Sequence, residues 1–466
     1  MAEQKKFRAI RGVRDILPPD TSLWNWFERT ARQVLESYGY REIRLPVFEE
    51  TQLFARSVGT DTDIVSKEMY TFPDPFDLDE LIKVRMRKGV DRTKVRPSGE
   101  GSPAPIWDDF SEFQWLTLRP EATASVVRAY IEHGMHTWPG NVRLYYVGPM
   151  FRRERPQKGR YRQFYQIGAE VLGRSDHPAI DAELIEMLTV LLGRCRIERW
   201  TLLLNSIGCA NCRPKYVARL REALFKVREK LGPDSQRRME TNPLRVLDSK
   251  LPEEQPVIET LPRISDYLCE DCREHFTGVQ EELKLRGIAY EVNWRLVRGL
   301  DYYMRTTFEI TSPALGAQNA LVGGGRYDGL SQLLGGPPAT GIGFALGEDR
   351  FLDAIKAAGQ VEAAHPVDVL IAWIGAAAYP AAVKLARSLR DTALVVEVPA
   401  EEMKLKKSLG LADKLGARYA LLLGESELAS GQFVLRRMAD GGQKKLTESE
   451  LVEYLKSEQS KSGSKS

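Results

Sequence analysis

The densest concentration of chemically capable side chains lies in residues 151–164. Six arginines or lysines, one acid and three aromatic residues stand within these fourteen positions. Arginine is always charged and presents a planar fork that can bind phosphate oxygens in pairs, and an aromatic ring can stack on a base. The composition therefore indicates a site for a polyphosphate attached to a base. The alternative is a solvated run of charges, which is the usual role of such a segment.

The flanking residues predict the element that carries this segment. Apolar stretches at 144–150 and 165–172 lie on either side of it. Short apolar stretches that bound a polar tip are typical of a β-hairpin. We therefore expect two half-buried strands with the basic residues at the turn between them.

Glycine and arginine recur together in three later segments. Residues 298–303 read RGLDYY, residues 323–330 read GGGRYDGL and residues 341–350 read GIGFALGEDR. Glycine allows close packing near a nucleotide. On their own, residues 323–325 could equally form a hairpin turn and residues 341–347 the start of a helix. The sequence contains no Gly-x-x-x-x-Gly-Lys-[Ser/Thr] loop, so a Walker-type ATP site is not expected.

These motifs resemble the signatures of one enzyme family. Arg152, Glu154 and Phe164 form an Arg-x-Glu followed by a loop and a Phe, which resembles the second signature of class II aminoacyl-tRNA synthetases. Residues 341–350 resemble the third signature. Residues 298–303 and 323–330 resemble two segments specific to histidyl-tRNA synthetases. The resemblance covers nearly the whole chain, and the motifs occur in the family's order.

The N-terminal region resembles the first class II signature. Apolar residues recur at helical spacing from about residue 20 to Tyr38, and Gly39 is well placed to end that helix. A strand is expected at 41–47. A long helix, a strand and a proline form the dimer interface in the family, so the resemblance implies a homodimer. Taken alone, the segment would be an ordinary amphipathic helix.

The resemblance implies a histidine–tRNA ligase that uses ATP and Mg2+. The carboxylate of L-histidine attacks the α-phosphate to give histidyl-adenylate and pyrophosphate, and histidine is then transferred to the 3′ end of tRNA(His). Because both reactants are negative, the site must neutralise charge and align them. By resemblance, Arg152 binds the α-phosphate, and Arg298, which follows an expected strand at 292–297, replaces a metal there. Glu154 accepts from the adenine amino group, while Phe164 and Arg350 cover its two faces, Arg350 also holding the far phosphate. Mg2+ is expected from the ATP chemistry and not from a visible ligand set.

The resemblance also implies a set of residues that bind histidine. In this set Glu121, Thr123 and Gln166 bind the ammonium group, whereas Glu170 and Tyr303 bracket the imidazole. The full set is Glu121, Thr123, Arg152, Gln166, Glu170, Arg298, Tyr302 and Tyr303. One departure is Ala122, where the family more often has Gly.

Gln166 and Glu170 can also be assessed from their spacing. They are four residues apart on an expected strand, so their side chains point to the same face. A carboxylate in an apolar strand is costly without a partner. Glu170 therefore needs a cation or a donor, whether its role is to bind histidine or to form a buried ion pair.

Four of the five cysteines have the spacing of metal ligands. Cys209 and Cys212 form one C-x2-C pair and Cys269 and Cys272 form another. Such pairs are typical of structural zinc sites, although the gap between the pairs is longer than in compact zinc ribbons. The sequence leaves two alternatives open, namely a structural Zn2+ ion or four reduced thiols packed in a small domain.

The pattern of elements predicts three domains. An α+β catalytic domain, with an antiparallel sheet flanked by helices, is expected at 1–207 and 291–360, with a surface excursion at about 74–113. A helical insertion domain is expected at 208–290. Alternating strands and helices at 366–457 predict a small α/β domain with a mostly parallel sheet, which resembles the family's anticodon-binding domain. The Ser/Lys-rich residues 458–466 are expected to be disordered.

Composition limits the remaining classes. The net charge is +3, so contacts with nucleic acid must come from local basic patches. We expect no membrane span and a cytoplasmic location. Two rivals are a regulatory subunit of ATP phosphoribosyltransferase, which typically lacks the anticodon-binding domain and active-site residues, and an RNA-binding module without catalysis.

Overall fold

The computed structural model of the chain describes residues 7–60, 62–74, 114–156, 159–316, 319–359 and 367–463. The predicted excursion at 74–113 lies, apart from Asp74, outside the described residues. The chain divides into two compact units, one comprising residues 1–16 and 24–361 and the other residues 17–23 and 362–466. Among the described residues, no helix combines the length and apolarity that crossing a bilayer requires.

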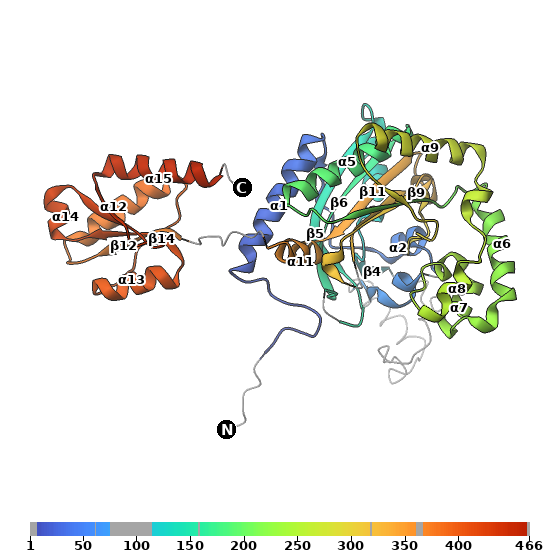
Figure 1. Cartoon of the computed structure of the whole chain (residues 1–466), viewed down its shortest axis with the longest axis horizontal. Coiled ribbons are helices and arrows are strands. Elements are labelled where there is room, and N and C mark those ends of the chain that lie inside the picture. Colours follow the sequence, from blue (N-terminus) through green and yellow to red (C-terminus); the bar gives the residue numbers. More distant parts are fainter. Residues whose placement is uncertain are drawn as a thin grey trace, which may run out of the picture. The chain divides into compact units, whose positions relative to one another are not determined.

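An eight-stranded sheet forms the centre of the first unit (Figure 1). Its order is β1 (Arg41–Glu42), β5 (Val142–Phe151), β6 (Gln163–Gly173), β11 (Thr340–Gly347), β10 (Ala320–Arg326), β9 (Met304–Thr311), β7 (Thr201–Ser206) and β8 (Glu291–Val292). The short edge strands β1 and β8 pair in parallel with their neighbours, and all other neighbours are antiparallel. The predicted antiparallel catalytic sheet is therefore confirmed.

Helices and a small second sheet surround this sheet. The helices are α1 (Asp20–Ser37), α2 (Thr51–Val58), α4 (Thr123–Glu132), α5 (Pro178–Arg194), α10 (Leu330–Leu333) and α11 (Glu348–Ala357). The small sheet consists of β2 (Phe48–Glu50), β4 (Trp115–Leu118) and β3 (Tyr70–Pro73). The apolar stripe predicted for α1 is buried, and Phe27 stacks on Phe351 of α11 with ring centroids 4.7 Å apart. A buried aromatic pair of this kind fixes α1 against α11.

The hairpin predicted around the basic segment is present. Strands β5 and β6 pair from Val142 opposite Leu172 to Phe151 opposite Gln163. Leu144, Tyr146 and other alternate residues of β5 are buried, as expected for a strand with one face on the core. The hairpin thus carries the basic residues between 152 and 162 at its tip.

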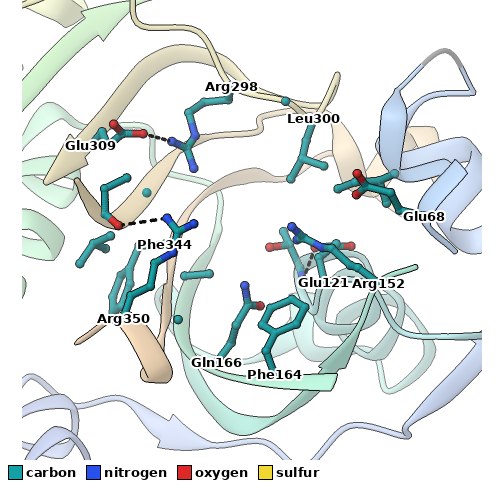
Figure 2. Close-up of a pocket in the computed structure, with 18 of the residues that line it drawn as sticks. Glu68, Glu121, Arg152, Phe164, Gln166, Arg298, Leu300, Glu309, Phe344 and Arg350 are labelled. Atoms are coloured by element: carbon teal, nitrogen blue, oxygen red, sulfur yellow. Dashed lines mark hydrogen bonds and ion pairs between the residues drawn. The ribbon is translucent and has the colours of Figure 1, made fainter. Parts of the chain in front are cut away.

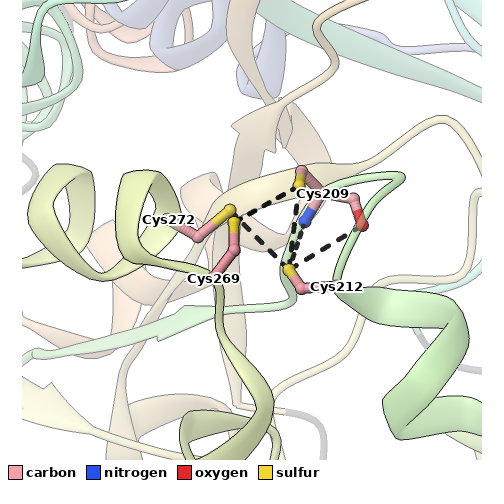
Figure 3. Close-up of side chains that lie close together, drawn as sticks. All are labelled: Cys209, Cys212, Cys269 and Cys272. Atoms are coloured by element: carbon pink, nitrogen blue, oxygen red, sulfur yellow. Dashed lines mark hydrogen bonds between the residues drawn. The ribbon is translucent and has the colours of Figure 1, made fainter.

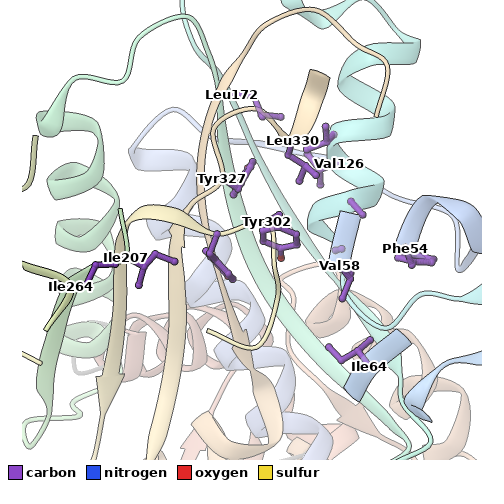
Figure 4. Packing of buried hydrophobic residues seen from close by; sticks show 14 of the residues in the cluster. Phe54, Val58, Ile64, Val126, Leu172, Ile207, Ile264, Tyr302, Tyr327 and Leu330 are labelled. Atoms are coloured by element: carbon purple, nitrogen blue, oxygen red, sulfur yellow. The ribbon is translucent and has the colours of Figure 1, made fainter. Parts of the chain in front are cut away.

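The insertion predicted at 208–290 is helical in the structure. It contains α6 (Arg213–Lys226), α7 (Pro233–Thr241), α8 (Gln255–Ile258) and α9 (Glu270–Leu285), joined by short 3-10 turns, and α9 runs beside α5 (Figure 1). Its buried residues, such as Leu220 and Ile264, belong to the same hydrophobic cluster as Phe54 and Tyr302 (Figure 4). The insertion and the catalytic sheet therefore share one core.

The second unit contains a five-stranded sheet with helices. The strands, in sheet order, are β13 (Val396–Glu397), β12 (Val367–Trp373), β14 (Ala417–Leu423), β15 (Phe433–Arg437) and β16 (Gln443–Leu446), and the helices are α12 (Ala378–Arg390), α13 (Leu405–Lys414), α14 (Glu425–Ser430) and α15 (Glu448–Gly463). Only β13, β12 and β14 are parallel. The prediction of a mostly parallel sheet was wrong for the β14–β15–β16 half, where hairpins follow one another. The prediction of disorder at 458–466 was wrong for residues 458–463, which continue helix α15, and residues 464–466 lie outside the described residues.

Two predicted strands are shorter than expected for the same physical reason. The strand at 41–47 ends at Glu42, and the carbonyls of Leu45 and Pro46 accept hydrogen bonds from the Arg119 guanidinium at 3.0 and 3.1 Å. The strand at 292–297 ends at Val292, and the amide of Asn205 donates to the carbonyls of residues 294 and 296. In both cases buried side chains satisfy carbonyls that a neighbouring strand would otherwise have bound.

Candidate active site

One cavity of about 560 Å³ opens over the antiparallel sheet of the first unit. Every nucleotide- and histidine-binding residue expected from the sequence lines it: Glu121, Thr123, Arg152, Glu154, Phe164, Gln166, Glu170, Arg298, Tyr302, Tyr303 and Arg350. Figure 2 shows the three arginines entering this space from different elements. The structure therefore brings together residues that are far apart in the sequence, around a volume large enough for a nucleotide and an amino acid.

Glycines of β10 and β11 form the floor of the cavity. A Cβ atom on Gly323 would lie 2.0 Å from Nη2 of Arg298, and one on Gly343 would lie 1.6 Å from Oε2 of Glu170. A Cβ atom on Gly325 would lie 3.0 Å from the ring of Tyr303. Because these glycines have no side chain, Arg298, Glu170 and Tyr303 can lie directly against the strands. Residues 323–325 and 341–347 lie inside strands, so neither the hairpin turn nor the helix start considered for them is correct.

Arg298 lies in the segment that returns from the insertion to the sheet. Its Nη1 donates to Glu309 of β9 at 2.8 Å, and its guanidinium carbon lies 5.9 Å from the Tyr303 ring centroid. Its buried Nε has no hydrogen-bond partner among the described residues. An unpaired donor on this partly buried cation can accommodate an additional acceptor, such as a phosphate or carboxylate oxygen.

Arg152 directly follows β5, at the beginning of the hairpin tip. Its Nε donates to the carbonyl of Pro120 at 3.0 Å, and its guanidinium lies 5.2 Å from the ring centroid of Phe164 on β6. The carboxylate of Glu154 lies 3.9 Å from Arg152 and 3.3 Å from Arg160. The hairpin thus presents a cation, an aromatic face and an acceptor to the same space.

Arg350 enters the cavity from the first turn of α11. Burial and the neighbouring Arg160 lower the pKa of its guanidinium, and Arg152 acts in the same direction, whereas the carboxylates of Glu154 and Glu309 act in the opposite direction. Buried like charges at close range are unfavourable unless an anion lies between them. This end of the cavity therefore favours an anionic ligand.

A group of acceptors occupies another part of the cavity wall. The carboxylate of Glu121 accepts from the backbone N–H groups of Thr123 at 2.7 Å and Ala124 at 3.1 Å, at the start of α4. Burial raises the pKa of Glu121 despite these donors. Oε1 of Gln166 is buried and has no partner among the described residues. These acceptors match the requirements of an ammonium group.

Glu170 is fully buried at the back of the cavity. It accepts from the Thr123 hydroxyl at 2.7 Å and from the Tyr327 hydroxyl at 2.6 Å. Burial raises the pKa of Glu170 to about 8, although both hydroxyls act in the opposite direction. Glu170 therefore has two hydroxyl donors as its partners, and no ion pair of Glu170 occurs within the described part of the chain.

Two residues that were not expected from the sequence hold the site in place. Tyr327 supplies a hydroxyl to Glu170, and Glu309 pairs with Arg298. Tyr327 stands inside one of the glycine-rich motifs, which was a usable signal. No motif around Glu309 identifies it as a site residue. It lines the cavity because β9 pairs with β10, which places Glu309 opposite Gly323.

The four cysteines come together outside this cavity. Their sulfur atoms all lie within 4.8 Å of one another, although the two pairs are separated by a large part of the insertion. None of the four lines the cavity. The thiols are free, and no disulfide joins them.

Comparisons with known proteins agree with this architecture. A family model described as histidyl-tRNA synthetase matches residues 106–350, and a model of an anticodon-binding domain matches residues 368–458. The chain is 51% identical to a histidine–tRNA ligase of Koribacter versatilis and 50% identical to one of Solibacter usitatus. In each case the match covers 96% of this chain, and it covers 96% and 98% of the respective relatives. The apo histidyl-tRNA synthetase of S. aureus superposes with a TM-score of 0.73 at 33% identity, covering 97% of this chain and 100% of that one.

The antiparallel sheet and the arginine-lined cavity above it define a class II aminoacyl-tRNA synthetase. This class was expected from the signatures at residues 152–164 and 341–350. Within it, the chain belongs to the histidyl-tRNA synthetase family. The predictions of a ligase and of histidine–tRNA ligation are thereby confirmed at the level of the family.

Proposed function

We propose that this chain activates L-histidine with ATP in the cavity over its antiparallel sheet and transfers the histidyl group to the 3′ end of tRNA(His). The observation that carries the proposal is that one cavity brings together three arginines and two buried carboxyl groups. Arg152, Arg298 and Arg350 line it together with the buried carboxylates of Glu121 and Glu170. A triphosphate and an amino acid with a cationic ammonium group require such a pair of environments.

The arginines act on the reacting groups. Arg152 and Arg298 bind the α-phosphate and the attacking carboxylate, so that two anions can approach in line. The unpartnered Nε of Arg298 supports this role. Phe164 and Arg350 hold the two faces of adenine, Glu154 accepts from its amino group, and Arg350 also contacts the far phosphate. Arg152 and Arg298 are thus the proposed catalytic residues.

Different residues bind the ammonium group and the imidazole of histidine. Glu121, Thr123 and Gln166 accept from the ammonium group, which supplies the missing partner of the Gln166 carbonyl. Glu170 and Tyr303 flank the imidazole, and Tyr302 packs at 4.8 Å between ring centroids against Tyr303. Polar contacts of this type discriminate strongly against isosteres, because an amino acid without the matching group leaves buried acceptors unpaired.

The remaining ligands follow from the same chemistry. Mg2+ binds proteins through one or two carboxylates together with substrate phosphates, and Glu309 is the cavity carboxylate beside Arg298 that fits this role. The ion would neutralise phosphate charge. Outside the active site, a structural Zn2+ ion fits the cluster of Cys209, Cys212, Cys269 and Cys272.

Partners and location are also part of the proposal. The exposed lysines of α13 and its N-cap, at positions 404, 406, 407 and 414, suit the phosphates of the anticodon stem-loop. The chain works as a cytoplasmic homodimer, with α1 contributing to the dimer interface. Light scattering at enzyme concentrations would test the dimer directly.

Histidine-dependent ATP–pyrophosphate exchange tests the proposed reaction. Exchange is expected with histidine and not with other amino acids, followed by charging of a tRNA(His) transcript. Exchange with a different amino acid would overturn the specificity assignment. Absence of exchange with every amino acid would instead favour the regulatory or RNA-binding rivals.

A further inference from the structure

The four cysteines are arranged as ligands of one tetrahedral metal ion. The Sγ atoms of Cys209 and Cys212 lie 3.7 Å apart, those of Cys209 and Cys269 lie 3.8 Å apart, and those of Cys212 and Cys272 lie 3.8 Å apart (Figure 3). A zinc ion with Zn–S bonds of about 2.3 Å requires sulfur atoms about 3.8 Å apart. A disulfide would bring them to about 2 Å. The spacing is therefore that of a metal site.

The surrounding backbone favours thiolates, which are the form that binds a metal. Backbone N–H groups donate to sulfur, from Cys209 to Sγ of Cys212 at 3.2 Å and from Asn211 to Sγ of Cys209 at 3.4 Å. Cys212 is the N-cap of α6 and Cys269 is the N-cap of α9. The positive ends of two helices of 14 and 16 residues therefore lie at the cluster, where they stabilise negative charge on sulfur.

Residues on either side of the first cysteine pair are hydrogen-bonded to the histidine-binding segment. Arg213, which directly follows Cys212, donates from Nη1 to the carbonyl of Tyr303 at 2.6 Å. The backbone of Arg305 donates to the carbonyl of Gly208 at 2.9 Å and accepts from the N–H of Ile207 at 2.8 Å. The loop that carries the first two cysteines thus holds residues 303–305 from behind. Tyr303 itself lines the cavity on the other side.

We propose that the four cysteines bind one structural Zn2+ ion and that this centre positions Tyr303 in the histidine site through Arg213. Four sulfur donors in a tetrahedral arrangement select zinc or iron among common metals, and the absence of any redox step in the reaction favours zinc. The ion joins the start of the insertion at residues 209–212 to its last helix, which begins after Cys269. Arg213 is a positioning residue, and its effect on histidine rests on the proposed function of Tyr303.

The metal is tested first, on the full chain purified under reducing conditions without a metal-affinity step. Elemental analysis is expected to find about one zinc per chain. Cys209→Ala and Cys272→Ala are expected to lose it, whereas Cys195→Ala, the matched control at a buried cysteine outside the cluster, retains it. Absence of zinc from the wild-type chain, iron in its place, or retention of zinc by both ligand variants would each overturn the metal site.

The positioning role is tested with Arg213→Ala, which leaves all four ligands intact. Displacing a group that orients a site residue typically costs about 10- to 100-fold. We therefore expect the KM for histidine in pyrophosphate exchange to rise roughly tenfold, with zinc content and the KM for ATP unchanged. Arg219→Ala is the matched control, since Arg219 is exposed on the same helix and forms an exposed ion pair with Glu222.

The outcomes separate the two proposals. An unchanged KM for histidine in a zinc-loaded Arg213→Ala chain would refute the positioning role and leave the metal site standing. An equal rise in the KM for ATP would also refute it, because general destabilisation would then explain the effect. A wild-type chain that holds zinc but does not exchange with histidine would contradict the proposed function while supporting the metal site.

Discussion

Gly323 lies beneath the guanidinium of Arg298, which makes Gly323→Ala a test of the role proposed for that arginine. The added Cβ would lie 2.0 Å from Nη2, 2.5 Å from Cζ and 2.6 Å from Nη1 of Arg298. An ordinary contact begins at 3.4 Å, so the guanidinium has to move by about 1.4 Å, the difference between 3.4 and 2.0 Å. A displacement of about 1 Å can cost on the order of 100-fold in rate.

We therefore expect histidine-dependent ATP–pyrophosphate exchange to fall about 100-fold in Gly323→Ala, equivalent to about 2.7 kcal/mol in the activation free energy. The fold should persist, because the atoms that must move belong to the end of a flexible side chain. Gly193→Ala is the matched control. Gly193 lies in α5, and nothing lies within 4 Å of a Cβ built there, so exchange should be unchanged.

A double variant distinguishes displacement of Arg298 from other effects of the added methyl group. If Gly323→Ala acts through Arg298, then Arg298→Ala and the combined variant should have similar exchange rates, because the same interaction is removed only once. Multiplicative losses would show that the methyl group acts elsewhere. Near-normal exchange in Arg298→Ala, with the melting temperature unchanged, would refute the catalytic role of this arginine.

Further predictions concern the histidine side of the site and the core beneath it. Because the pKa of Glu170 is raised to about 8 from its ordinary value of 4.5, the native state retains a proton that the unfolded state loses between those values. The free energy of unfolding should therefore fall with rising pH across this window, by up to about 1.4 kcal/mol per pH unit. Glu170→Gln should remove that slope in urea titrations from pH 5 to pH 8, and parallel curves for the two proteins would contradict it. Tyr327→Phe removes the hydroxyl that donates to Glu170 at 2.6 Å. We expect the KM for histidine to rise about tenfold with the KM for ATP unchanged, since the hydroxyl fixes the protonated carboxyl group of Glu170 and a neutral hydrogen bond contributes up to about 1.5 kcal/mol. An effect on ATP instead would exclude Tyr327 from the histidine site. Asp181→Asn removes one of the two carboxylates that pair with the buried Arg326 and leaves Asp328 as the other. Scanning calorimetry should detect a loss of about 3 kcal/mol, the lower end of the range for a broken buried pair, whereas Glu222→Gln, in an exposed pair on α6, should change little.

Local patterns predicted those elements whose own residues determine them. The hairpin of β5 and β6 followed from apolar stretches around a polar tip, and β12 (Val367–Trp373) and β15 (Phe433–Arg437) lie in the region predicted to alternate strands and helices. Each contains a short apolar stretch of the kind that favours a strand, so the local sequence preference and the fold agree there. The same holds for α1, whose helical spacing of apolar residues is continuous.

Contacts between distant segments could not be predicted in this way. The carbonyls of residues 45 and 294 are bound by Arg119 and Asn205, which lie 74 and 89 positions away. No residue near either segment indicates that a side chain, and not a neighbouring strand, binds these backbone carbonyls. The glycines of β10 show the same limit, because their propensity favours a turn, and only the side chains of Arg298 and Tyr303 explain why small residues stand in a strand there.

The charges of the cavity explain why binding of the two substrates should be coupled. Burial lowers the pKa of Arg350 and raises the pKa of Glu121 and Glu170, so the protein surroundings oppose the charged form of both kinds of group. Arg152 lowers the pKa of Glu121 and would also repel an ammonium group placed beside it. A phosphate bound to Arg152 would cancel that repulsion, because the net charge beside Glu121 then falls. Each substrate therefore supplies the counter-charge that the other one's binding groups lack, and by linkage each should strengthen the binding of the other.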